Sequence, residues 1–133
     1  MLDFFLAIQN TPFSAAIVLA QLYLREGQPA KGLALVQTLV NQQPANAGLQ
    51  NLLGSAHAQN GDPKAARAAF EKAAQLSPDL TQAQLNLARL DLDARALDAA
   101  EQRLTNVLKT NPRDTDALAD MARVADLRGK TAE

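Results

Sequence analysis

The sequence predicts an all-α protein built from helical hairpins stacked in series. The first observation is a fixed interval: Pro44, Pro78 and Pro112 lie 34 residues apart. The second is that the same interval separates Gly27 from Gly61. A fixed period of this size indicates one supersecondary unit copied along the chain, in which each copy buries its apolar face against the next.

The period divides the chain into repeats. Three full repeats cover residues 13–46, 47–80 and 81–114. We expect a single array that also includes a leading helix over 1–12 and a partial repeat over 115–133. The leading helix is expected to pack on the first repeat. The chain ends where the second helix of the fourth repeat would begin, so we expect it to be a fragment of a longer protein.

Each repeat has a turn residue near its middle and a proline near its end, which predicts two helices separated by a tight turn. Glycine supplies the positive φ that stops the first helix, and proline cannot continue the second helix. In the third repeat, Arg95 occupies the glycine position. Either Arg95 adopts a positive φ, or this turn takes another form.

The second repeat carries the clearest helical pattern. Its two apolar stripes are Leu49, Leu52, Leu53, Ala56 and His57 in the first helix, and Ala66, Ala69, Phe70, Ala73 and Ala74 in the second. Apolar residues that recur every three or four positions indicate one buried helix face. Alanines let the two helix axes approach closely, and Phe70 is expected to fill the gap beside them.

This pattern resembles the tetratricopeptide repeat signature, Trp-x2-Leu-Gly-x2-Tyr followed by Ala-x3-Phe and Pro. The residues that carry the resemblance are Leu53, Gly54, His57, Gly61, Asp62, Ala66, Phe70, Ala73 and Pro78. Gln50 departs from the signature where an aromatic residue is common, and His57 stands where tyrosine is usual. The resemblance covers most of the chain and implies a right-handed α-solenoid that serves as a scaffold for protein binding.

Two runs, residues 64–73 and 85–92, are also similar to the repeat lipoproteins of bacterial exosortase (PEP-CTERM) systems. Those systems are associated with exopolysaccharide export and protein sorting. The resemblance implies that the parent protein is exported, membrane-anchored and located on the periplasmic side of a bacterial envelope. Without that resemblance, a cytoplasmic location would be expected.

Composition excludes several classes of function. The net charge is −1 and no basic cluster is present, which argues against electrostatic capture of nucleic acid. The chain has no cysteine, so thiol chemistry is excluded. No apolar run approaches the roughly 20 residues that span a membrane, so we expect no direct membrane contact from this segment.

The sequence predicts no catalytic activity, cofactor or metal. The single histidine, His57, lies on an apolar helix stripe and is expected to be a packed interior residue. A metal site needs several converging ligands, and no second histidine or cysteine is available. All six glycines are isolated, so there is no phosphate-binding loop. The carboxylates of Asp91, Asp93 and Asp98 are expected on solvated helix surface and in turn capping.

A protein or peptide partner is expected in the concave groove that the first helices of such an array line. The candidate groove residues are Gln21, Asn51, Ser55, Gln59, Leu85, Arg89, Leu92 and Arg123. Amide side chains both donate and accept hydrogen bonds along a peptide backbone. The arginines suit a carboxylate, and the leucines suit apolar side chains.

Some proteins of this family hold a partner's terminal carboxylate with basic and asparagine residues on three successive first helices. The corresponding positions here hold Ile17, Gln21, Leu52, Gln82 and Asn86 in one frame, and Asn51, Ser55, Asn86, Asp116 and Asp120 in the next. Neither frame supplies a lysine or an arginine. Binding of a chaperone tail in that manner is therefore disfavoured.

The main alternative to a peptide scaffold is self-association, including a homodimer formed through the chain ends. The partial fourth repeat lacks a second helix to cover its apolar face, which consists of Leu118, Met121, Ala122 and Ala125. The leading helix carries a second apolar face with Phe4, Phe5 and Ile8. Exposed patches of this kind favour association.

Overall fold

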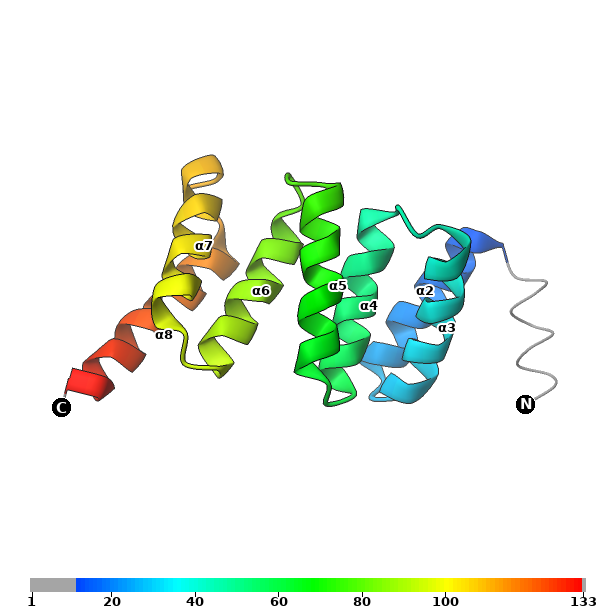
Figure 1. Cartoon of the computed structure of the whole chain (residues 1–133), viewed down its shortest axis with the longest axis horizontal. Helices are drawn as coiled ribbons and strands as arrows, with labels where there is room; N and C mark the ends of the chain where they lie inside the picture. The colour runs from blue at the N-terminus through cyan, green and yellow to red at the C-terminus, as the bar shows by residue number, and fades with distance from the viewer. Residues whose placement is uncertain (1–11, 133) are drawn as a thin grey trace. The chain divides into compact units, whose positions relative to one another are not determined.

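The computed structural model describes residues 12–132, with the backbone alone for the last two, and in this range it contains seven α-helices and no strand (Figure 1). The helices are α2 (Phe13–Arg25), α3 (Pro29–Gln42), α4 (Ala47–Gln59), α5 (Pro63–Leu76), α6 (Thr81–Asp93), α7 (Leu97–Thr110) and α8 (Thr115–Ala132). The predicted all-α fold of helical hairpins is confirmed. The leading helix expected over 1–12 lies outside the described residues, apart from Pro12.

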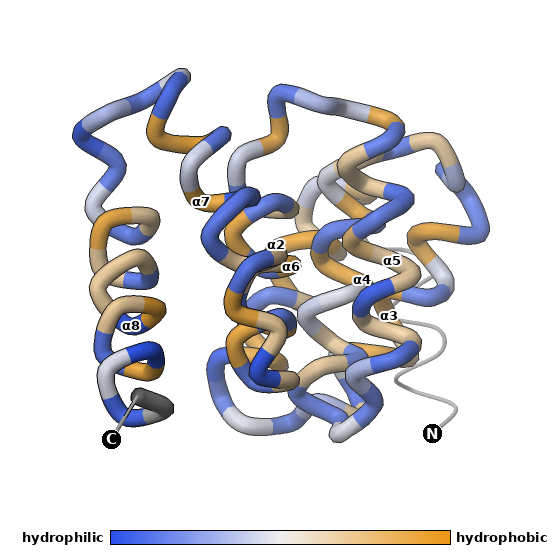
Figure 2. The backbone as a smooth tube through the Cα atoms, turned by 60° about the vertical axis from the view of Figure 1, so that its left-hand side comes forward, coloured by the Kyte–Doolittle hydropathy of each residue, from blue (hydrophilic) through white to orange (hydrophobic). Residues whose placement is uncertain are grey.

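The helices form two compact units that divide after Leu76. The N-terminal unit contains α2 to α5, and the C-terminal unit contains α6 to α8. The first helices of the repeats, α2, α4, α6 and α8, begin at Phe13, Ala47, Thr81 and Thr115, in steps of 34 residues. Figure 2 shows hydrophobic and hydrophilic positions alternating along each helix, as expected when one face of a helix packs on a neighbour.

Three turns within the hairpins have the same hydrogen-bond pattern. After α2, Gly27 N–H donates to the carbonyl of Leu24 at 3.3 Å, and Gln28 N–H donates to that of Tyr23 at 2.8 Å. This pair of bonds is the Schellman motif, which needs a left-handed residue after the helix. Gly27 has φ 74° and Gly61 has φ 83°.

The third hairpin turn is built the same way, although its left-handed residue is Arg95. Arg95 has φ 62°, and its N–H donates to the carbonyl of Leu92 at 3.1 Å. Ala96 N–H completes the motif by donating to the carbonyl of Asp91 at 2.8 Å. Of the two forms left open by the sequence, the structure adopts the one with a positive φ. A non-glycine residue in this region carries backbone strain.

The connections between repeats are turns with proline at the second position. In the first of them, Asn46 N–H donates to the carbonyl of Gln43 at 3.1 Å, and the turns at Pro78 and Pro112 are closed by equivalent bonds. The side chain of Gln50, which is 5% exposed, donates to the carbonyl of Pro44 at 2.9 Å. This bond explains why a buried glutamine replaces the usual aromatic residue, since its amide is paired.

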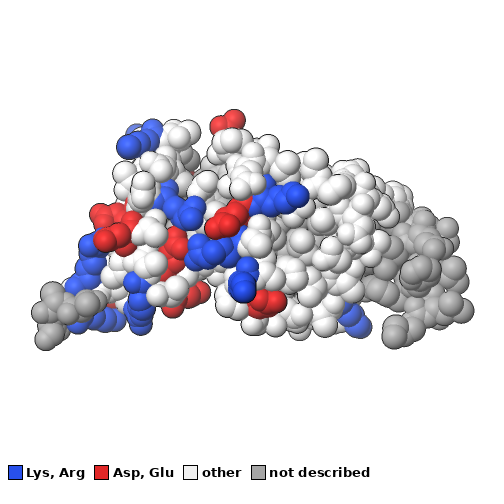
Figure 3. All heavy atoms as spheres, in the orientation of Figure 1, with Lys and Arg blue, Asp and Glu red and all other residues white. Residues whose placement is uncertain are grey.

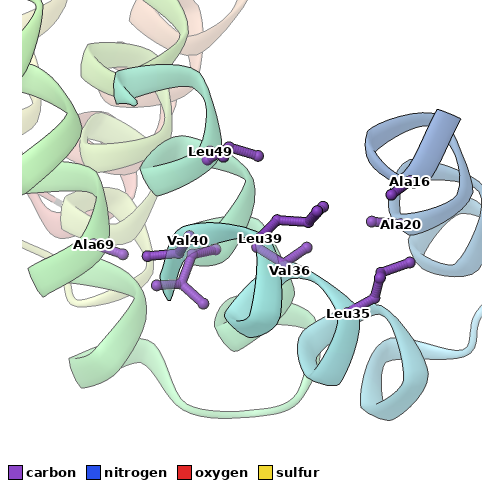
Figure 4. Close-up of a cluster of buried hydrophobic side chains, with 9 residues drawn as sticks. Ala16, Ala20, Leu35, Val36, Leu39, Val40, Leu49 and Ala69 are labelled. Atoms are coloured by element: carbon purple, nitrogen blue, oxygen red, sulfur yellow. The ribbon is translucent and has the colours of Figure 1, made fainter. Parts of the chain in front are cut away.

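The core of the N-terminal unit is built from alanine, leucine and valine. In Figure 4, Ala16 and Ala20 of α2 point toward Leu35, Val36 and Leu39 of α3, and the cluster extends to Leu49 of α4 and Ala69 of α5. The closest approach lies in the second hairpin, between α4 and α5. A Cβ atom added to Gly54 would lie 2.4 Å from the ring of Phe70, which is itself 2% exposed. Phe70 therefore packs directly against the glycine, in the gap that the sequence predicted for it.

The C-terminal unit buries one apolar cluster and two carboxylates. Its apolar residues include Leu85, Leu104 and Val124. Asp91 is also buried, and Arg103 Nε donates to its carboxylate at 2.9 Å across the hairpin. The expectation that Asp91 lies on solvated surface is therefore wrong, because an arginine on the second helix compensates its burial.

The last helix, α8, differs from the earlier first helices. Those helices end at the left-handed turn, whereas α8 runs through Gly129, the register position of Arg95, and continues to Ala132. Gly129 does not have a positive φ. The side chains of Leu118, Ala122 and Ala125 are exposed on α8, as the sequence predicted for a helix without its hairpin partner, while Met121 is half-buried and packs against the core.

Candidate functional site

The first helices of the N-terminal unit, α2 and α4, contact each other and carry four of the candidate residues. Gln21 on α2 and Gln59 on α4 are exposed, while Asn51 and Ser55 are half-buried on α4. No Lys, Arg, Asp or Glu occurs between Lys31 and Asp62. The candidate surface on α4 is therefore polar but uncharged. In Figure 3, few charged side chains are visible in the region where Figure 1 places α2, α3 and α4, and more are visible over α5.

Two candidates in the C-terminal unit do not lie on an exposed surface. Leu85 is 0% exposed and Leu92 is 2% exposed, and both belong to the core cluster. Ala117 and Val124 of α8 are buried in the same cluster. The prediction that these leucines line an open groove is wrong, because a first helix is covered on one side by its own hairpin partner and on another by the next first helix.

The two candidate arginines are paired within the chain. Arg89 Nε donates to Asp120 Oδ2 at 2.9 Å, and Arg123 Nη1 lies 3.5 Å from Asp120 Oδ1. A second carboxylate, Asp116, lies 3.8 Å from Arg89 Nη2. Asp120 is 4% exposed, and these arginines offset the cost of burying its carboxylate. Both arginines were expected to bind a ligand's carboxylate, and here both approach the same internal one.

The sequence reasoning missed Asp120 as the centre of this cluster. It lies 31 residues after Arg89, one helical turn before the position equivalent to Arg89 in the next repeat. Side chains on consecutive first helices meet at about this offset, since α6 and α8 contact each other. One period minus one helical turn is a separation of 31 residues. A search of the sequence for oppositely charged residues at this separation would have found Arg89 and Asp120.

A shallow depression lies beside this cluster, between the end of α6 and the middle of α8. It has a volume of about 270 Å³ and is lined by Leu92, Asp93, Arg95, Arg123, Asp126 and Leu127. Two arginines and two aspartates balance its charge. Its size and mixed lining suit a single side chain of a partner better than a small-molecule substrate.

The remaining chemistry is sparse in the described part of the chain. His57 is half-buried on α4. Within residues 12–132, no group of three histidine, cysteine or acidic side chains is arranged to hold a metal ion. None of the seven described helices combines the length and apolar character needed to cross a membrane.

Comparison with known proteins identifies the repeat. Residues 17–81 and 57–123 each match a family model described as tetratricopeptide repeat. No curated protein matches the chain in sequence. Among solved structures, the first TPR domain of the human RPAP3 protein is 16% identical, with a TM-score of 0.81 over 91% of this chain and 96% of that one.

Two further structures are similar. The first TPR domain of Spaghetti (RPAP3), solved with the HSP90 peptide SRMEEVD, is 15% identical, with a TM-score of 0.79 over 88% of this chain and 93% of that one. The TPR domain of P58(IPK) is 25% identical, with a TM-score of 0.76 over 90% of this chain and 34% of that one. These likenesses concern the fold, and together with the two family models they show that the chain belongs to the tetratricopeptide repeat family.

Proposed function

We propose that this chain is a non-catalytic protein-interaction scaffold that binds an extended peptide or protein segment on the surface of its first helices. One observation carries the proposal. The residues at one register position, Gln21, Ser55, Arg89 and Arg123, are polar and exposed or half-buried on all four first helices. The residue before each of the first three is small and buried: Ala20, Gly54 and Ala88. Within the N-terminal unit, Gln21 and Ser55 therefore lie beside a tightly packed seam, an arrangement that a peptide backbone can follow.

The charges on the first helices indicate which kind of peptide segment this chain would bind. The peptide bound to the Spaghetti domain ends in the acidic sequence EEVD, and a human RPAP3 domain is described with an HSP70 peptide that has the same ending. Here the α4 surface carries no positive charge, and Arg89 and Arg123 face Asp120. We therefore propose a partner segment that is held mainly by neutral hydrogen bonds, through Gln21, Asn51, Ser55 and Gln59.

A peptide-display selection on the intact chain, followed by fluorescence anisotropy with a selected peptide, tests this. The double variant Gln21→Ala, Gln59→Ala should weaken binding about tenfold, since it removes two hydrogen-bonding amides worth about 0.5–1.5 kcal/mol each. The matched control is Gln42→Ala, Gln75→Ala, which removes two exposed glutamines from second helices. Equal losses in the two double variants would contradict the proposal, and so would affinity that depends strongly on salt.

Self-association is the second candidate function. It is favoured by the uncovered face of α8, where Leu118 is 47% exposed beside Ala122 and Ala125. An exposed apolar patch of this kind favours contact with another molecule. Met121 is a poor probe of this face, since it packs partly into the core.

A cellular setting is proposed from the sequence alone. The similarity of residues 64–73 and 85–92 to repeat lipoproteins supports a parent protein on the periplasmic side of a bacterial envelope, within an exopolysaccharide or protein-sorting export system. Fractionation of cells that express the parent protein tests this assignment. Recovery in the cytoplasmic fraction would overturn it and leave the proposed peptide binding unaffected.

A further inference from the structure

The turn between α6 and α7 differs from the two earlier hairpin turns at both positions that set its backbone. Arg95 and Leu97 stand where the earlier turns have glycine and proline, namely Gly27, Gly61, Pro29 and Pro63. Glycine accepts a positive φ without strain, and proline suits the first residue of a helix. Arg95 nevertheless has φ 62°, and Leu97 is the first residue of α7. Both residues of the third turn therefore suit its backbone less well, and both have larger side chains.

The two replacements line the same open depression on the C-terminal unit. Its volume is about 430 Å³, and it is lined by Arg95, Leu97, Leu127 and Lys130. Leu127, on α8, is a third departure, because its equivalents at the ends of the earlier first helices are all polar: Arg25, Gln59 and Asp93. Three of the four lining residues thus differ in character from their equivalents in the earlier repeats.

The charge of this depression is positive. Arg95 is exposed, and its guanidinium makes no ion pair within residues 12–132. Four other arginines of the same unit each pair with a carboxylate: Arg89, Arg103, Arg123 and Arg128. Lys130 Nζ lies 3.1 Å from Asp126 Oδ2, but both side chains are largely exposed, so this pair contributes little. Two cations are therefore available to an anion.

The neighbouring depression of about 270 Å³ does not have this character. It shares Arg95 and Leu127 with the larger depression, but Asp93 and Asp126 balance its charge. No acidic residue is among the four described residues that line the larger one. An anionic group is therefore attracted to the larger depression.

Leucines form the apolar part of the same depression. Leu97 and Leu127 are half-buried, and both pack against the core cluster of the C-terminal unit. The core holds these side chains in place, while their remaining surface faces the depression. A ligand that covers this surface removes apolar area from water. The lining therefore suits a ligand that has an anionic part and an apolar part.

We propose that this depression binds an acidic side chain, together with an adjacent apolar side chain, from a segment of a partner protein. The planar guanidinium of Arg95 donates two parallel hydrogen bonds to the carboxylate. Lys130 adds a second positive charge, and the apolar side chain covers Leu97 and Leu127. Because the depression is open, a segment can cross it without ending there. The backbone strain at Arg95 fits this role, since strained residues are found where they position a group that contacts a ligand.

This site is separate from the polar surface of α2 and α4, and the inference does not rest on the peptide binding proposed for that surface. The two proposals therefore fail separately. The double variant Gln21→Ala, Gln59→Ala should bind a ligand of the Arg95 depression as tightly as the unchanged chain does.

Titration of the intact chain with short blocked peptides, followed by NMR of the backbone amides, tests the site. The probe acetyl-Glu-Leu-amide should shift the amide signals of Arg95, Leu97, Leu127 and Lys130. It should bind at least about fivefold more tightly than acetyl-Gln-Leu-amide, because a hydrogen bond between two charged groups is stronger than one to a neutral amide. Its affinity should fall as the salt concentration rises, since the site is exposed.

Two variants of Arg95 remove the charge without disturbing the turn. Asparagine tolerates a positive φ and glycine accepts it freely, so Arg95→Asn and Arg95→Gly should both fold. Each should weaken binding of acetyl-Glu-Leu-amide at least about fivefold. Arg113→Asn is the matched control, because Arg113 is exposed in the same unit and also makes no ion pair in the described part of the chain. It should leave the affinity unchanged.

Several results would overturn the proposal. The first is equal affinity for the glutamate and glutamine probes, and the second is an equal loss in Arg95→Asn and Arg113→Asn. The absence of shifts around Arg95 at millimolar concentrations of acetyl-Glu-Leu-amide would also count against it. Tighter binding of acetyl-leucine, which has a free carboxylate, would assign the site to a chain terminus instead of an acidic side chain. A loss of probe binding in Gln21→Ala, Gln59→Ala would contradict the separation of the two sites.

Discussion

The contact between Gly54 and Phe70 makes a strong prediction about a substitution that would ordinarily stabilise a helix. Replacing glycine by alanine inside a helix gains about 0.8–1 kcal/mol from backbone propensity. At position 54, however, the new Cβ would lie 2.4 Å from two ring carbons of Phe70. The ring is 2% exposed and enclosed by the core, so it has little room to move away.

The overpacking at this contact should outweigh the propensity gain. Inserting a methyl group into a well-packed core costs about 1–3 kcal/mol and sometimes more, and a contact of 2.4 Å belongs at the upper end of that range. Subtracting the propensity gain, we expect Gly54→Ala to lower the free energy of unfolding by about 2 kcal/mol. Urea denaturation followed by circular dichroism measures this loss.

Two further variants isolate the cause. Gly129→Ala is the matched control, because it adds the same methyl group to a helical glycine with nothing within 4 Å, and it should be neutral or slightly stabilising. Phe70→Ala alone should cost about 3–5 kcal/mol, because it leaves a cavity in the hairpin. In the double variant Gly54→Ala, Phe70→Ala, the methyl group added at position 54 fills part of that cavity. The losses in free energy of unfolding of the two single variants should therefore not add. The close approach of α4 and α5 would be refuted if Gly54→Ala stabilised the protein. It would also be refuted if the free-energy losses of the two single variants added up in the double variant.

Three other predictions concern the C-terminal unit. Arg95→Gly should be neutral or stabilise by up to about 1 kcal/mol, since it relieves a positive φ, and a clear loss in urea denaturation would contradict the turn geometry. Arg89→Ala should destabilise by about 1.5–3 kcal/mol, because it removes the charged hydrogen bond to buried Asp120, and a loss below about 0.5 kcal/mol would show that the pair is unimportant. Leu118→Glu should abolish any concentration-dependent association seen by sedimentation equilibrium, and a dimer that survives this change would place the contact elsewhere.

The sequence predicted the positions that depend on one repeat alone. A proline that cannot continue a helix and a glycine that accepts a positive φ act locally, so Pro78 and Gly61 end their helices as expected. Phe70 was likewise placed correctly, because the alanines around it belong to the same hairpin. The sequence did not decide the form of the turn at Arg95. A residue other than glycine at that position can either adopt a positive φ or require a different turn.

The candidate site was predicted less well because it depends on neighbouring repeats. An apolar stripe read from one hairpin leaves Leu85 and Leu92 outside, whereas the structure buries them in a cluster that includes residues of the next first helix. The pairing of charges also depends on residues that lie far apart in the sequence. Asp91 pairs with Arg103 across a hairpin, and Asp120 lies between arginines of two helices. A polar residue on a repeat surface is thus a candidate for ligand binding only after its partners one period away have been considered. In this chain, that condition weakens Arg89 and Arg123 as candidates, because both approach the carboxylate of Asp120.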